Sequence, residues 1–178
     1  MSNYRIEIAD QQNLLAIDEI WLRDIVAHIL LEEHVAAATM TVALVSDAEI
    51  RRINREFLGH DYPTDVISFR LDEGLNQNSG VAPQNSARVD REMTSHGLSC
   101  PNTDDGLEGE LVISIETTIR EASVHGWSAY DELVLYLVHG ILHLCGYNDT
   151  TDDSRPLMRA RERALLSRWQ LVPTGLET

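Results

Sequence analysis

Residues 139–149 read His139-Gly140-Ile141-Leu142-His143-Leu144-Cys145-Gly146-Tyr147-Asn148-Asp149, so two histidines stand four residues apart in an apolar run. Residues four apart lie on one face of an α-helix, about 6 Å apart along its axis. Gly146 breaks the helical pattern, and a turn there would let the carboxylate of Asp149 fold back beside the two imidazoles. The spacing therefore predicts a metal site with three protein ligands and an open position for water.

The residues before this segment predict a helix that faces the core. Ser128 is a good N-cap, and Asp131 follows at the third helical position as a capping-box partner. His139 and His143 lie beside the apolar stripe, one turn apart. The stripe itself consists of Leu133, Leu137, Gly140, Ile141 and Leu144.

Hydrophobic periodicity predicts the remaining elements. Strands are expected over 4–8, 39–45, 65–69 and 110–115, and further helices over 16–36, 47–57, 116–125 and 155–170. Ser46 and Glu49 form a capping-box pattern at the start of the second of these helices, and Gly59 should end it. Four short strands with four or five helices predict an α+β domain.

The same periodicity predicts which side chains of three helices face inward. The inward residues are expected to be Ile50, Ile53 and Phe57, then Ile119, Ala122 and Ser123, and finally Leu157, Met158, Leu165, Leu166 and Trp169.

Composition indicates one domain over residues 1–178 with an insertion at about 72–109. That stretch is rich in Asn, Ser, Gly, Asp and Pro, and it lacks hydrophobic periodicity. The formal net charge of −15 disfavours non-specific attraction to phosphate backbones. A nucleic-acid enzyme with this charge would need a local basic patch or a partner that positions the substrate.

Location follows from what the sequence lacks. It has no apolar signal region at the N-terminus and no run long enough to span a bilayer. Its two cysteines, Cys100 and Cys145, do not indicate a disulfide framework. We therefore expect a protein of the reducing cytoplasm without membrane association, and the pattern specifies no oligomeric state.

The donor set narrows the identity of the metal. Many histidine pairs at this spacing bind nothing, but the added Gly146 and Asp149 favour one divalent ion. Two imidazoles and a carboxylate suit Zn²⁺ and also match non-haem iron oxygenases, whose ligands usually lie on sheets. A helical pair with a third ligand past the helix end favours Zn²⁺, which lowers the pKa of bound water towards ~7.

Gly140 separates this motif from a zinc peptidase, which carries a glutamate base directly after the first histidine. Two explanations of the glycine remain open. It permits close helix packing, or it gives clearance over the metal or the substrate.

Three collinear blocks carry a family resemblance. The 139–149 segment resembles the HGxLHLxGYDH signature of the YbeY family of rRNA-maturation endoribonucleases. Ile53–Phe57 with Pro63–Phe69 is similar to that family's LNxxYR…PTDVLSF block, and Gly109–Ser114 is similar to its GDIVI strand. Met158 and Glu162 follow the metal motif as the family's distal M…E residues do.

The resemblance implies a metal-dependent single-strand endoribonuclease that acts on rRNA precursors with the small ribosomal subunit. The implied roles are 16S rRNA 3′-end processing and ribosome quality control. The implied fold is a small mixed sheet covered by helices, with His139, His143 and Asp149 holding the metal at the C-terminal end of a central helix. The family's third ligand is histidine, so Asp149 is one departure.

A second departure lies at Leu58, where the family has an arginine that would bind phosphate or stabilise the transition state. Arg55 or Arg70 could take its place. Asp65 and Ser68 are candidates for the lining of the cleft, and turn capping explains Asp65 equally well. Glu110 is a candidate hydrogen-bond partner of a ligand histidine.

Four arginines of the last helix, Arg159, Arg161, Arg163 and Arg168, could contact RNA, although a solvated face is the favoured interpretation. Two other functions stay open. One is a ribosome-associated metal-binding maturation factor without nuclease activity, which Leu58 and the acidic charge favour. The other is a zincin-like peptidase, which the missing glutamate disfavours.

Overall fold

The computed structural model of the protein describes residues 3–71 and 106–171. Its sheet has the strand order β1-β2-β4-β3. The strands β1 (Asn3–Asp10), β2 (Ala37–Val45) and β4 (Leu107–Ser114) run parallel, and β3 (Val66–Arg70) is antiparallel to β4. The predicted small mixed sheet of four strands is confirmed.

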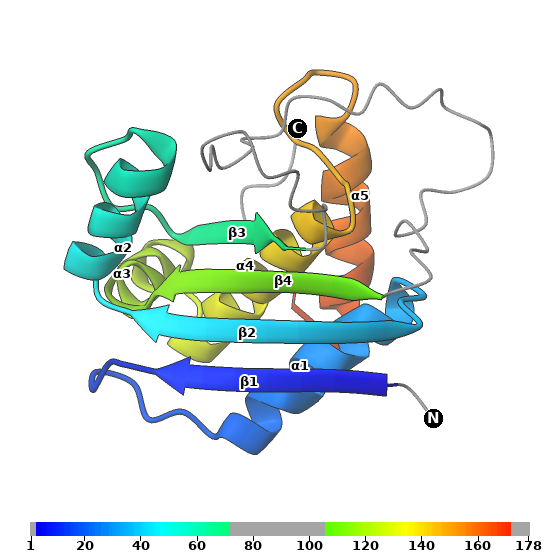
Figure 1. Ribbon diagram of the computed structural model, residues 1–178, viewed down its shortest axis with the longest axis horizontal. Coiled ribbons are helices and arrows are strands. Elements are labelled where there is room, and N and C mark those ends of the chain that lie inside the picture. The colour runs from blue at the N-terminus through cyan, green and yellow to red at the C-terminus, as the bar shows by residue number, and fades with distance from the viewer. Residues whose placement is uncertain (1–2, 72–105, 172–178) are drawn as a thin grey trace.

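Helices lie on both faces of this sheet (Figure 1). The large hydrophobic cluster joins the sheet to α1, α4 and α5, and a smaller one lies on the other face near α2. The helices are α1 (Glu19–Glu32), α2 (Asp47–Ile53), α3 (Ile115–His125), α4 (Ala129–Leu144) and α5 (Arg155–Leu166), with a π-helical turn η1 (Asn54–Leu58) and a 3₁₀ turn η2 (Ser167–Trp169).

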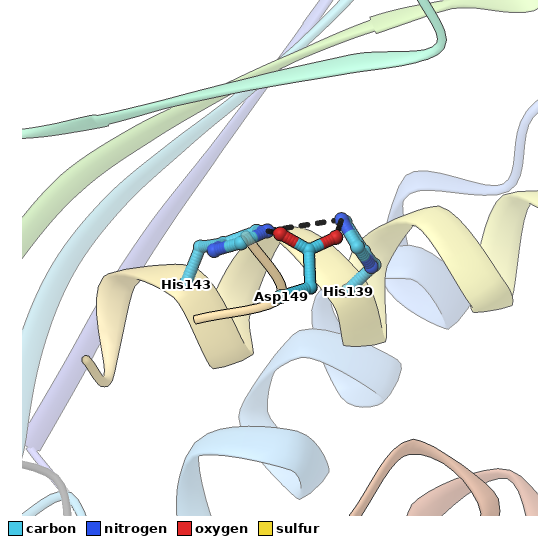
Figure 2. A group of neighbouring side chains, drawn as sticks. All are labelled: His139, His143 and Asp149. Carbon is cyan, nitrogen blue, oxygen red and sulfur yellow. Dashed lines mark hydrogen bonds and ion pairs between the residues drawn. The ribbon is translucent and has the colours of Figure 1, made fainter. Parts of the chain in front are cut away.

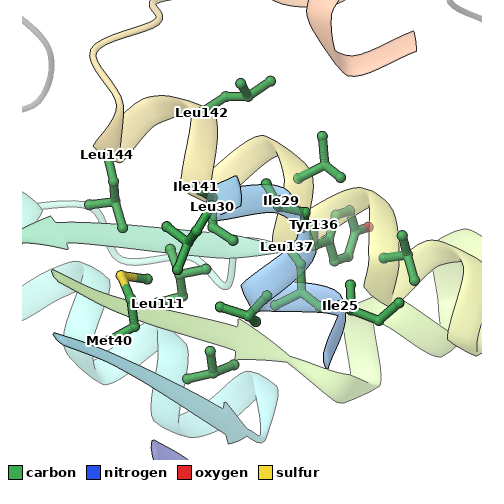
Figure 3. Packing of buried hydrophobic residues seen from close by; sticks show 14 of the residues in the cluster. Ile25, Ile29, Leu30, Met40, Leu111, Tyr136, Leu137, Ile141, Leu142 and Leu144 are labelled. Carbon is green, nitrogen blue, oxygen red and sulfur yellow. The ribbon is translucent and has the colours of Figure 1, made fainter. Parts of the chain in front are cut away.

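The core that positions α4 forms between that helix, α1 and the sheet (Figure 3). The predicted inward stripe of α4 is buried along its whole length. Ile29 and Leu30 of α1 and Leu111 of β4 meet Leu137 and Ile141 of α4 in this layer. Because a close-packed interior tolerates little movement, α4 has a fixed position over the sheet.

Local signals placed the ends of several helices correctly. Ser128 and Asp131 form the predicted capping box of α4. The side chain of Ser46 accepts a hydrogen bond from the Glu49 amide at the start of α2. Gly59 ends η1 with a φ of +74°, in the left-handed region that glycine adopts without a Cβ clash.

Other boundaries differ from the predictions. The expected strand 110–115 begins earlier, at Leu107, because Leu107 pairs with Ala38 of β2 and the parallel ladder continues from there. Its first residues therefore belong to the sheet rather than to the predicted insertion, and residues 72–105 lie outside the described part of the chain. The helix expected over 16–36 is shorter, since Asp18 caps it and β2 starts at Ala37.

Within residues 3–71 and 106–171, none of the helices combines the length and apolar character that a membrane span requires.

Candidate metal centre

The last two turns of α4 and the following loop bring three potential ligands together (Figure 2). Gly146 has a φ of +92°, and the chain turns there so that Asp149 lies beside the helix. The Nε2 atoms of His139 and His143 are 3.0 Å apart. The Asp149 carboxylate oxygens lie 4.0 Å from His139 Nε2 and 3.8 Å from His143 Nε2.

These separations fit one small ion. Zn–N and Zn–O bonds of about 2.0–2.2 Å in tetrahedral geometry place neighbouring ligand atoms about 3.3–3.6 Å apart. The two Nε2 atoms are 3.0 Å apart, and these atoms and one oxygen of Asp149 all lie within 4.8 Å of one another. Small side-chain rotations therefore bring both imidazoles and the carboxylate onto a common centre. Two imidazole nitrogens and one carboxylate oxygen are donors that suit Zn²⁺.

Each histidine is oriented by a hydrogen bond from its other ring nitrogen. His139 Nδ1 donates to Oε1 of Glu162, a buried residue of α5, at 2.6 Å. His143 Nδ1 donates to the Tyr147 carbonyl at 3.1 Å. Because Nδ1 carries the proton in both rings, each Nε2 keeps a lone pair for a metal. These two hydrogen bonds fix the tautomer that a metal ligand requires.

Nearby carboxylates make this site favourable for positive charge. Burial disfavours protonation of His139, yet the hydrogen bond and charge of Glu162, with Asp65 and Asp149, raise its pKa above the ordinary value. Burial and the neighbouring His139 lower the pKa of His143. Since three carboxylates act on one imidazole, the centre favours a bound cation.

Gly140 allows α4 to approach the sheet closely. A Cβ built there would lie 2.8 Å from Leu111 Cδ2 and 3.2 Å from Ser68 Oγ. Ser68 Oγ also donates to the Gly140 carbonyl at 3.2 Å. The packing explanation of this glycine therefore holds, and a glutamate base at position 140 would collide with the sheet.

Of the two predicted carboxylates, Asp65 acts on the metal centre and Glu110 does not face it. Asp65 Oδ1 accepts hydrogen bonds from Thr64 Oγ1 and the Val66 amide, and its charge acts on His139. Glu110 pairs with Phe69 across the β3–β4 ladder, and its neighbour Leu111 faces α4. Alternate residues of a strand point to opposite faces, so Glu110 points away from α4. The carboxylate that contacts a ligand histidine is Glu162 instead.

The family's distal M…E pattern is the one sequence signal that marks Glu162. A single carboxylate in an arginine-rich helix carries no local signal of burial.

The three positions considered for a cationic side chain lie in different parts of the fold. Leu58 packs against the small hydrophobic cluster on the sheet face opposite α4. The Arg55 side chain is 63% exposed and lies 3.6 Å from Asp61. Arg70 Nη1 donates to the carbonyl of Leu144, at the C-terminal end of α4, at 3.1 Å. Of these positions, Arg70 is the one held against the helix that carries the histidines.

The last helix departs from the expected solvated face at Arg161. Arg161 Nε lies 2.6 Å from Oε1 of Glu33, which is buried at the end of α1. Arg161 Nη2 also donates to the Glu32 carbonyl at 2.7 Å. Arg161 therefore ties α5 to α1, whereas Arg168 forms an exposed ion pair with Glu32.

The mixed sheet and the helical histidine pair with a returning carboxylate define a class of α/β proteins with a candidate metal centre on the central helix. The family model described as Endoribonuclease YbeY matches residues 6–170. The chain therefore belongs to the YbeY endoribonuclease family, as its three sequence blocks predicted.

Individual relatives agree with this assignment. The endoribonuclease YbeY of Halalkalibacterium halodurans is 31% identical over 173 residues, covering 96% of this chain and 98% of the relative. That of Moorella thermoacetica is 37% identical over 130 residues, covering 73% and 72%. The solution structure of TM1509 from Thermotoga maritima matches with a TM-score of 0.50 at 20% identity, covering 94% and 91% of the two chains, and so supports the fold alone.

Proposed function

We propose that this protein is a metal-dependent endoribonuclease that cleaves single-stranded RNA with one divalent ion, Zn²⁺ being favoured, held by His139, His143 and Asp149. The observation that carries the proposal is the convergence of three ligand atoms within 4.8 Å of one another. The curated relatives are named endoribonucleases, which supports RNA as the substrate. The substrate proposed from the family resemblance is rRNA precursor on the small ribosomal subunit, in the cytoplasm.

The chain's own residues prepare the reaction. Glu162 and the Tyr147 carbonyl hold the two imidazoles in the tautomer that presents Nε2. Asp65 adds negative charge beside His139. When bound, a divalent ion supplies Lewis acidity and makes water more acidic, which is the chemistry needed for hydrolysis of a phosphodiester.

Metal analysis and RNA cleavage test the proposal together. Wild-type protein should contain about one divalent ion per chain and cleave a single-stranded oligoribonucleotide. His139→Ala should lose the ion and the activity, and Asp149→Ala should bind the ion more weakly. His60→Ala, which removes an exposed histidine outside the centre, is the matched control. Failure of metal-loaded wild type to cleave RNA, with or without ribosomal subunits, would refute the enzymatic proposal.

A second candidate is a metal-binding ribosome-maturation factor without nuclease chemistry. The packing of Leu58 into a hydrophobic cluster favours it, because the family arginine at that position is missing. Co-sedimentation of metal-loaded protein with small-subunit precursors, without any RNA cleavage, would support this candidate over the first.

A further inference from the structure

The two ligand histidines are oriented by acceptors of different kinds. His139 Nδ1 donates to the carboxylate of Glu162 at 2.6 Å. His143 Nδ1 donates instead to the backbone carbonyl of Tyr147 at 3.1 Å. A hydrogen bond to a neutral carbonyl is longer and weaker than one to a carboxylate. The orientation of His143 therefore depends on what holds the loop residue Tyr147 in place.

The backbone attaches Tyr147 to α4 through its amide. That amide donates to the Leu142 carbonyl at 3.0 Å, at the end of the helix. Gly146, the residue before it, has a φ of +92°, and the chain leaves the helix there. Because glycine has more backbone freedom than other residues, the direction of the next carbonyl needs a second attachment.

The side chain of Tyr147 supplies this second attachment. Tyr147 is 8% exposed and lies in the large hydrophobic cluster. Its hydroxyl donates to the carboxylate of Glu33, which is 2% exposed and stands at the C-terminal end of α1. Burial, followed by the charge of Glu33, raises the pKa of Tyr147 to about 12, so the hydroxyl keeps its proton and remains the donor.

Glu33 is itself held by α5. Arg161 Nε lies 2.6 Å from Glu33 Oε1, and Arg161 Nη2 donates to the Glu32 carbonyl at 2.7 Å. The planar guanidinium thus bonds to a side chain and to a carbonyl at the end of α1, which defines its geometry. Because a buried carboxylate is costly without partners, Glu33 has a fixed position between the arginine and the tyrosine hydroxyl.

We propose that Glu33 is a positioning residue of the metal centre, which acts through the Tyr147 hydroxyl to aim the Tyr147 carbonyl at Nδ1 of His143. This inference rests on the proposed function, in which His143 is a metal ligand. The connection runs from α1, which carries none of the three ligands, to the loop between α4 and α5. Loss of the hydroxyl would let the loop carbonyl rotate, and His143 would no longer be held in the tautomer that presents Nε2.

Tyr147→Phe tests the inference, because it removes the hydroxyl and keeps both the ring and the carbonyl. Zn²⁺ affinity, measured by competition with a chromophoric chelator, should fall about tenfold, the lower end of the effect of partners of ligand histidines. Tyr4→Phe is the matched control and should bind Zn²⁺ as wild type does. The Tyr4 hydroxyl also donates at the end of α1, at 2.6 Å, but its acceptor is the Val35 carbonyl rather than a group of the metal loop.

A second measurement separates positioning from stability. Nitrogen-15 NMR of the metal-free protein, under conditions in which the ring is neutral, reports which nitrogen of His143 carries the proton. Wild type and Tyr4→Phe should show the proton on Nδ1, whereas Tyr147→Phe and Glu33→Ala should show a mixture of the two tautomers. Glu33→Gln, which keeps an acceptor oxygen for the hydroxyl, should retain the wild-type tautomer.

The outcomes distinguish this inference from the proposed function. An unchanged His143 tautomer or an unchanged Zn²⁺ affinity in Tyr147→Phe would overturn the inference, as would an equal loss of affinity in Tyr4→Phe. In each of these cases the proposed function stands if wild type binds Zn²⁺ and cleaves RNA. Absence of Zn²⁺ binding by wild type would instead refute the proposed function.

Discussion

Glu162 is the single residue on which the orientation of His139 depends most directly, because it accepts the Nδ1 proton at 2.6 Å. We expect Glu162→Ala to weaken Zn²⁺ binding about 10- to 100-fold, since partners of ligand histidines have effects of that size. Glu162→Gln keeps an acceptor oxygen and should fall between Glu162→Ala and wild type. Competition with a chromophoric chelator measures the affinity.

Glu121→Gln on α3 provides the control for loss of one carboxylate, and its affinity should equal that of wild type. Equal affinities for wild type and Glu162→Ala would mean that the hydrogen bond does not position the ligand.

Asp47 predicts how stability depends on pH. Its carboxylate accepts hydrogen bonds from the Ser114 hydroxyl, from Thr117 Oγ1 at 2.7 Å and from Arg120 Nη1 at 3.0 Å. Burial alone would raise the pKa of Asp47, but these hydrogen bonds, with Ser114 the strongest, lower it below the ordinary 3.8. A group with a depressed folded-state pKa stabilises the protein above its unfolded pKa. That contribution disappears as the pH falls through the folded-state pKa.

We therefore expect Asp47→Asn to be less stable than wild type by about 1–2 kcal/mol at pH 7. The difference should shrink as the pH falls below the ordinary 3.8. Urea unfolding at a series of pH values measures it. Asp152→Asn, at a fully exposed carboxylate, should show no difference at any pH. A constant gap for Asp47→Asn down to the acid limit would contradict the assignment.

The ion pair between α5 and α1 makes a prediction at the level of elements. Arg161→Met would leave the carboxylate of Glu33, 2% exposed, without its partner. Because Arg161 itself is partly exposed, we expect a loss of about 2–4 kcal/mol, near the lower end for a buried pair. Arg168→Met breaks an exposed pair with Glu32 and should cost less than about 1 kcal/mol.

Urea unfolding of both arginine variants gives the comparison. The double variant Glu33→Gln/Arg161→Met should recover part of the loss, since no charge then remains buried. Equal losses for Arg161→Met and Arg168→Met would show that the pair does not hold α5 on α1.

Helix ends were predictable from sequence because their signals are local. The buried faces of helices were less predictable because neighbouring elements determine them. Ser46 and Ser128 fix helix starts because their side chains accept hydrogen bonds from backbone amides, and Gly59 ends η1 with a left-handed backbone, so these predicted ends are confirmed. The inward faces were partly wrong: Phe57, Ile119 and Leu157 are exposed, and so is Ser123. Helical spacing gives a face, but only the layout of the sheet and the other helices shows how much of it is covered.

The same contrast holds for the candidate site. His139, His143 and Asp149 were readable because their spacing alone brings them together on a helix and its following turn. The partner of His139 was not readable from local pattern, because α5 must first fold across α4 to bring Glu162 there. Glu110 was a candidate for the site but points away from it. Successive residues of a strand point to opposite faces, and its neighbour Leu111 is the one that faces α4.

Metal binding should stabilise the whole molecule. A ligand present at 100 times its Kd stabilises the folded state by about 2.7 kcal/mol. For a chain of 178 residues, this corresponds to a rise in Tm of about 5–10 °C. Thermal unfolding with Zn²⁺ and with excess chelator measures the shift. His139→Ala should show no shift, and a shift equal to that of wild type would place the stabilising ion elsewhere.

The Gly146 turn gives the centre a property that reaches beyond catalysis. All three ligands fall within residues 139–149, and so does Tyr147, whose carbonyl accepts the His143 proton, while Glu162 lies on the next helix, α5. Only short loops must close to assemble such a centre, so its entropic cost is small. The sheet, by contrast, pairs β2 with β4 across about 70 residues of chain. Contacts close in sequence form early, so the metal-binding unit can assemble before the parallel strands meet and then serve as a nucleus onto which the sheet closes.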